Sequence, residues 1–142
     1  EVFGFDEELL AFLPQPIKGI IVAIERLKRE EDVDKGSSDN NDKVNFYMKQ
    51  TKVLDNACGI IACLHAVLNN TDQVGLNEGT ILANWAGEAK TKNPEERATL
   101  LENADEFKTA HAAAAAEGQT GMSENQAAVK HHFVAYIVND NK

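Results

Sequence analysis

The chain has 142 residues, of which 43% are hydrophobic and 26% charged, the size and composition of one ordinary globular domain with its own core. Its formal net charge of −9 argues against a nucleic-acid partner, because binding phosphates requires a basic face. The acidic balance is compatible with a basic protein or peptide as partner.

The apolar runs are all shorter than the roughly 20 residues that span a bilayer, and the first residues are acidic, unlike a signal peptide. We therefore expect no membrane partner. Cys58 and Cys63 lie about 140° apart on a helix, at roughly 100° per residue, and do not form a disulfide framework. A reducing compartment fits these free thiols, and we expect a cytoplasmic monomer.

The first third of the chain contains a predicted helix, a predicted strand and a polar segment. Residues 6–13 have apolar positions at helical spacing after the N-cap candidate Asp6, and prolines follow them. Residues 17–24 form a short, β-branched apolar run, which predicts a buried central strand. Residues 28–43 have no periodicity and many turn formers, so we expect a surface loop there.

The middle of the chain predicts a strand and three helices. Residues 44–48 are a strand candidate leading to Gln50, and residues 58–68 predict a strongly apolar helix. Residues 78–89 predict a second helix, which carries Ile81, Leu82 and Trp85 on one side.

A third helix is expected to start at Asn93, because an N-cap residue there precedes Pro94 at the first helical position. We expect it to run through the alanines at 110–116 and to stop at Gly118. Residues 117–130 are predicted to be an exposed loop.

The chemistry centres on Cys58, where a polar approach changes abruptly into the apolar helix. The partial positive charge of a helix N-terminus favours the thiolate, which is the attacking species in cysteine chemistry. Residues 131–138 predict a strand opening on histidine, and His132 is the preferred base. His131 alternates with it, so only one of the two can face Cys58. The Gln50 side-chain amide and the Cys58 N–H are candidate oxyanion donors.

Structural interpretations stand beside these roles. A cysteine in an apolar helix is usually a small buried hydrophobe, which fits Cys63 inside the helix better than Cys58 at its edge. We expect His65 to be a hydrogen-bonded core or helix-face residue and His111 to face solvent. The adjacent pair of histidines has the wrong spacing for one metal-ligating helix face, and the sequence contains no Cys-x-x-Cys, Gly-rich phosphate loop or Gly-x-Ser-x-Gly. We expect no metal and no cofactor.

At these residues the sequence resembles the ubiquitin C-terminal hydrolases, specifically the small single-domain members of this family of cysteine peptidases. The collinear matches cover most of the chain and fall in residues 2–16, 46–51, 56–59, 64–66, 69–70, 93–98, 101–103, 117–120 and 132–135. Several matches in the same order are far more specific than one cysteine and one histidine.

The resemblance implies a deubiquitinating hydrolase that releases small or flexible adducts from the C-terminus of ubiquitin. It makes Cys58 the nucleophile, His132 the base and acid, and Gln50 the oxyanion donor, with Asn56 and Gly59 expected to bind substrate. Ubiquitin and ubiquitin adducts are then the partners.

The fold that the resemblance implies is α/β: a papain-like central antiparallel β-sheet flanked by helices, with a knotted path. A crossover loop, which maps to about residues 110–130, would cover the cleft.

Two departures from the family pattern accompany the resemblance. The stretch between Gln50 and Cys58 is two residues longer than in the family. The family's third catalytic residue is an Asp on a strand after the histidine strand, and that position would lie beyond Lys142. We expect residues 1–142 to be a single catalytic domain without its N-terminal and C-terminal segments. The alternatives are a catalytically impaired ubiquitin-binding domain of the same fold and a thiol enzyme acting on another acyl substrate.

Overall fold

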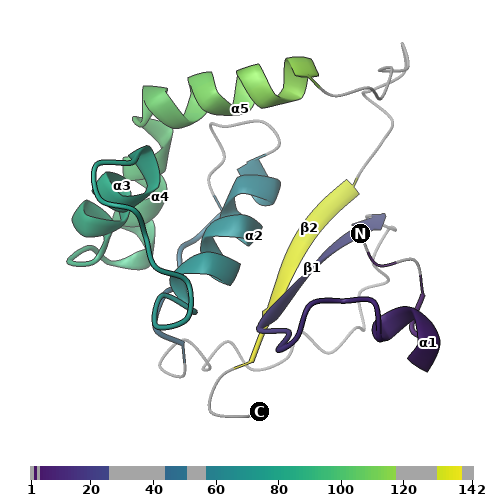
Figure 1. Ribbon diagram of the computed structural model, residues 1–142. Helices are drawn as coiled ribbons and strands as arrows, with labels where there is room; N and C mark the ends of the chain where they lie inside the picture. Colours follow the sequence, from purple (N-terminus) through teal and green to yellow (C-terminus); the bar gives the residue numbers. More distant parts are fainter. Residues whose placement is uncertain (1, 3, 26–43, 51–56, 118–130, 139–142) are drawn as a thin grey trace, which may run out of the picture.

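A computed structural model describes residues 2, 4–25, 44–50, 57–117 and 131–138 (Figure 1). In the view of Figure 1, helix α2 lies between a two-stranded sheet and helices α3 and α4, and α1 lies beyond β1. The predicted α/β class with an antiparallel sheet is confirmed. The elements, in chain order, are α1 (Glu7–Leu10), β1 (Gly19–Glu25), α2 (Ala57–Leu68), α3 (Ile81–Ala89), α4 (Pro94–Glu102), α5 (Asp105–Glu117) and β2 (His131–Ile137).

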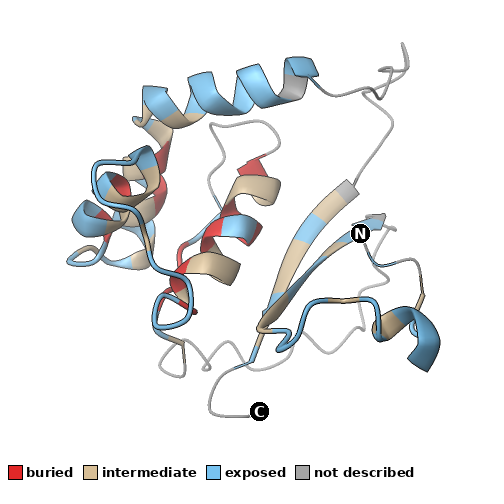
Figure 2. Cartoon of the chain, in the orientation of Figure 1, coloured by how far each residue is buried: buried red, intermediate tan, exposed pale blue. Residues whose placement is uncertain are grey.

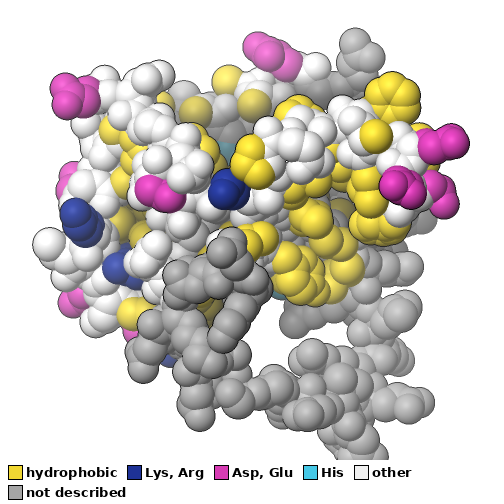
Figure 3. Space-filling model, turned by 60° about the horizontal axis from the view of Figure 1, so that its bottom comes forward, with side chains coloured by type: hydrophobic (Ala, Val, Ile, Leu, Met, Phe, Trp, Pro, Cys, Tyr) yellow, Lys and Arg dark blue, Asp and Glu magenta, His cyan; other side chains and the backbone are white. Residues whose placement is uncertain are grey.

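Strands β1 and β2 pair antiparallel, with Gly19 opposite Ile137 and Ile24 opposite His132. The β-branched run explains the strand, since such side chains fit a pleated surface. The prediction of a buried central strand is wrong for the part that the structure describes, because β1 pairs with β2 alone and Ile20 and Ile24 are 41% and 44% exposed. Hydrophobic side chains are exposed over much of the face shown in Figure 3.

The core lies among the helices rather than at the sheet. Buried residues, red in Figure 2, lie on α2, α3 and α4, whereas the strands show none in their described positions. Helix α2 contributes four positions at the spacing i, i+4, i+7 and i+11, which puts them on one face. The core cluster consists of Phe46, Met48, Ala57, Ile61, Leu64, Leu68, Trp85, Ala89, Ala98 and Leu101.

Helix α4 begins where the sequence predicts. The Asn93 side chain accepts hydrogen bonds from the N–H groups of Glu95 and Glu96 at 3.0 and 2.9 Å. The Glu96 carboxylate accepts from the Asn93 N–H at 2.9 Å, which completes a capping box, and Pro94 occupies the first helical position. These local contacts fix the start of α4.

The prediction that this helix continues through the alanines is wrong. Helix α4 ends at Glu102, Asn103 adopts φ −94° and ψ −1° as its C-cap, and α5 begins separately at Asp105. The Asp105 N–H donates to the Asn103 carbonyl at 3.1 Å across the break. Asn and Asp favour helix ends and turns over helix interiors, because their side chains compete for the hydrogen-bonding groups of the backbone.

Helix α5 lies along the outside of the helical half (Figure 1). The predicted crossover loop therefore begins as helix, up to Glu117, while residues 118–130 and the predicted loop at 28–43 lie outside the described residues. His111 is exposed, as predicted. Among the helices that the structure describes, none is long and apolar enough to cross a membrane.

Candidate active site

A cavity of about 420 Å³ lies between α2, β2 and residues 44–50. Gln50, Cys58 and His132 all line it, so the structure brings three sequence-predicted site residues from separate parts of the chain to one place. Its other lining side chains include Tyr47, Met48, His65, Asn69 and Phe133. The predicted substrate-binding residue Asn56 lies outside the described residues.

Helix α2 presents one face to this cavity. Cys58, Ala62, His65 and Asn69 line the cavity and recur at successive spacings of four, three and four residues, which aligns them along the helix. Cys58 is the second residue of α2, so its N–H is among the first-turn groups without an intrahelical acceptor. This N–H can therefore donate a hydrogen bond to an oxyanion.

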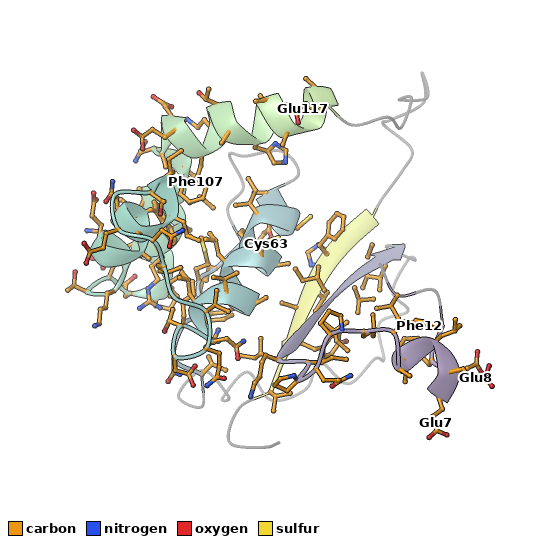
Figure 4. The ribbon with its side chains drawn as sticks, in the orientation of Figure 1. Glu7, Glu8, Phe12, Cys63, Phe107 and Glu117 are labelled. Carbon is orange, nitrogen blue, oxygen red and sulfur yellow. The ribbon has the colours of Figure 1, made fainter. Side chains whose placement is uncertain are left out.

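Cys63, labelled on α2 in Figure 4, is exposed, whereas Cys58 is half-buried. The expectation that Cys63 would be the buried one is therefore wrong. The helical spacing predicts the angle between the two thiols but not which of them is buried. Burial depends on how the sheet and the core pack on α2. Both thiols are free.

Residues 44–48 do not form the predicted strand, because His65 of α2 and Asn69, directly after the end of α2, take up hydrogen bonds of this segment. Asn69 Oδ1 accepts from the Phe46 N–H and Asn69 Nδ2 donates to the Phe46 carbonyl, both at 2.8 Å. The Met48 N–H donates to His65 Nε2 at 3.1 Å. The extended segment is thus attached to the helix that carries Cys58.

The other edge of this segment is attached to α4. The Tyr47 carbonyl accepts from Arg97 Nη1 at 2.6 Å, and the Lys49 N–H donates to the Pro94 carbonyl at 3.1 Å. An exposed ion pair between Lys49 and Glu95 lies beside them. Sequence reasoning missed Arg97, since an arginine in the first turns of a helix carries no signal of a partner 50 positions away.

His65 is a hydrogen-bonded helix-face histidine, as predicted. Its Nε2 must be unprotonated to accept from Met48, and burial lowers the pKa of the imidazole, which favours that neutral form. Its ring stacks on Tyr47 with centroids 5.5 Å apart. His65 therefore supports residues 46–50 and is not available as the base.

His132 stands at the start of β2, half-buried. The ring of the next residue, Phe133, lies against Gly59, where a Cβ would be 3.6 Å from Phe133 Cδ2. No hydrogen bond joins Cys58 to His132, both of which are described. Such contacts in thiol sites are often long without substrate and tighten on binding.

The side chains that line the cavity offer a thiol at a helix start, an imidazole and an amide, which are the groups required for acyl transfer through a thioester. In the described ranges, no three His, Cys, Asp or Glu side chains are grouped so that they could hold a metal ion.

Comparison with known families agrees with this chemistry. The sequence model of ubiquitin carboxyl-terminal hydrolase, family 1, matches residues 1–142. The chain belongs to this family. The resemblance predicted from the motifs is thereby confirmed.

Among its relatives, the chain is 34% identical over 131 residues to ubiquitin carboxyl-terminal hydrolase 3 of Arabidopsis thaliana, covering 88% of this chain and 55% of that protein. It is 34% identical over 139 residues to a ubiquitin carboxyl-terminal hydrolase of Aplysia californica, covering 96% and 64%. It is 30% identical over 142 residues to the human isozyme L1, covering 96% and 61%. The chain thus spans 55% to 64% of the length of these relatives.

Proposed function

We propose that the protein is a thiol-dependent deubiquitinase, which hydrolyses small or flexible adducts at the C-terminus of ubiquitin. One observation carries this proposal: Gln50, Cys58 and His132 line one cavity in a member of the ubiquitin carboxyl-terminal hydrolase family. The names of its relatives support the same reaction.

In the proposed mechanism the Cys58 thiolate attacks the carbonyl carbon of the last ubiquitin residue. The resulting oxyanion accepts hydrogen bonds from the Gln50 amide and the Cys58 N–H. The imidazolium of His132 protonates the leaving amine or alkoxide as the bond to the adduct breaks, which leaves a thioester. Water then attacks the thioester, His132 takes one of its protons, and the Cys58 thiolate leaves. Ubiquitin is released as the carboxylic acid, which loses its remaining proton to solvent.

We propose ubiquitin and its adducts as the partners, with the net charge of −9 helping to attract a basic ubiquitin tail. Gly59, and Asn56 before it, are proposed to contact the substrate. The reaction requires a reduced thiol, which supports the cytoplasm as the compartment. We also propose a monomeric, single-domain catalytic unit.

The test is labelling of the full-length protein with ubiquitin that carries an electrophile at its C-terminus, read by intact mass. We expect one adduct for the wild type and for Cys63→Ala, and none for Cys58→Ala. An adduct on Cys58→Ala, or none on the wild type, would contradict the proposal. Ubiquitin binding without an adduct would indicate a binding domain instead.

A second measurement follows turnover of a fluorogenic ubiquitin amide. Gln50→Ala should lower turnover by about 10²–10³-fold, the usual cost of one oxyanion donor. His132→Ala should remove turnover at neutral pH, because His132 is the group proposed to protonate the leaving amine. Unchanged turnover in either variant would contradict the assigned role of that residue.

A further inference from the structure

Arg97 joins α4 to the end of α3, 8 positions away, and to Tyr47, 50 positions away. Its Nε donates to the Ala89 carbonyl at the end of α3 at 2.9 Å, and its Nη1 donates to the Tyr47 carbonyl at 2.6 Å. Its Cζ lies 4.6 Å from the centroid of the Phe46 ring. Hydrogen bonds from a charged guanidinium are stronger than neutral ones, and the two donors hold a fixed geometry.

The segment that Arg97 holds leads directly to Gln50. On one edge of this segment, the peptide groups of Phe46 bond to the side chain of Asn69, directly after α2, and the N–H of Met48 bonds to His65 of α2. On the other edge, Arg97 holds the carbonyl of Tyr47 and α4 holds the N–H of Lys49. The α2 bonds tie the segment to the helix that carries Cys58, and the α4 bonds prevent the segment from rotating about that attachment.

We propose that Arg97 is a positioning residue, which sets the distance between the Gln50 amide and the Cys58 thiol by holding residues 47–49 against α4. This inference rests on the proposed thiol hydrolysis. Arg97 acts through the backbone and touches neither thiol nor imidazole among its described contacts. Its proposed role is therefore to position the backbone, whereas Gln50, Cys58 and His132 line the cavity itself.

Arg97→Lys is the informative substitution. Lysine keeps the positive charge but is a single flexible point donor, so it cannot hold the Tyr47 and Ala89 carbonyls together in the guanidinium geometry. A displacement of about 1 Å can cost on the order of 10²-fold in rate. We expect kcat to fall by about 10- to 100-fold, with KM changed by less than about threefold, because transition-state contacts are lost rather than binding.

The first experiment is a double-mutant cycle in the full-length protein with the fluorogenic ubiquitin amide. If Arg97 acts through Gln50, then Arg97→Lys should slow Gln50→Ala by less than about threefold, although it slows the wild type by tenfold or more. Thr99→Ala is the matched control, since Thr99 is an exposed residue of the same helix, and it should leave kcat unchanged. Fully additive losses would overturn the proposal.

The second experiment is hydrogen exchange, which does not depend on activity. Arg97→Lys should accelerate exchange of the Met48 and Lys49 amides by about tenfold or more and leave the interior amides of α2 unchanged. Unchanged exchange at these two amides would overturn the positioning role, even if turnover were lost. Absence of Cys58-dependent turnover in the wild type would instead refute the proposed function and any catalytic role of Arg97, while the exchange data would still decide whether Arg97 holds the segment.

Discussion

The two halves of the molecule support the candidate site differently. On the helical side, Leu101 and Met48 are 0% and 1% exposed, whereas Ile20 and Ile24 on the sheet are 41% and 44% exposed. Cys58 and Gln50 belong to the helical side, and His132 belongs to the sheet. The proposed nucleophile and oxyanion donors therefore depend on a packed core, and the proposed base depends on a strand pair with much less buried support.

We predict that replacing a large apolar side chain by alanine lowers the free energy of unfolding more on the helical side than on the sheet. Leu101→Ala should destabilise the protein by about 2–5 kcal/mol, as is usual for a fully buried leucine. Ile24→Ala should cost about 1 kcal/mol, because the removed atoms already face solvent in part. Denaturant unfolding of both variants checks this, and equal losses would show that the sheet is as well supported as the core.

The second largest effect on stability is expected where residues 46–50 are attached to α2. Asn69→Ala leaves the Phe46 N–H and carbonyl without their partner, and we expect a loss of about 2 kcal/mol. Asn103→Ala is the matched control, since that side chain donates to the Thr99 carbonyl at 3.0 Å on an exposed helix end. It should change stability by less than about 0.5 kcal/mol. Similar losses of stability in both variants would show that the hydrogen bonds of Asn69 to Phe46 contribute no more than an exposed hydrogen bond at a helix end.

The hydrogen bond from Met48 to His65 should make stability depend on pH. Burial lowers the pKa of His65 below its ordinary value of 6.5, so the unfolded chain binds more protons than the folded one just below that pH. This contribution is fully present above pH 6.5 and is lost as the pH falls below it. Stability curves of the wild type and His65→Gln should diverge there, and the control His111→Gln should follow the wild type. Parallel curves would contradict this origin.

The smallest effect is expected at the ion pair between Lys49 and Glu95. Both side chains are more than half exposed, and the hydrogen bond from Lys49 lowers the pKa of the Glu95 carboxyl. Solvent screens such pairs, so Glu95→Gln should leave the melting temperature and kcat unchanged within error. A tenfold loss of kcat would show that the exposed ion pair, and not Arg97 alone, positions Gln50.

Much of the fold could be predicted from local signals. The capping residues before α4, the apolar periodicity of α2 and the β-branched run of β1 each specify their element over a few consecutive residues. The three cavity residues could be selected because a helix start, a strand start and a strand-like approach are recognisable in sequence, and the family motifs link them.

The wrong predictions depend on contacts between distant residues. Residues 44–48 have a strand-like pattern, but Asn69 and His65 take the hydrogen bonds that another strand would need. Cys63 follows the helical period, yet it is exposed, and none of the elements that the structure describes buries its side chain. Arg97 could not be predicted at all, because its partners lie at the end of another helix and across 50 positions of sequence.

The exposed position of Cys63 also has a consequence for oxidation. An accessible thiol on the outside of a helix can join the same thiol of a second copy when its reducing agent is exhausted, and the product is a covalent dimer. We expect such a dimer on storage in air, removable by reductant and absent in Cys63→Ser. Sedimentation without reductant would then report a covalent dimer even if the reduced protein is the monomer that we propose.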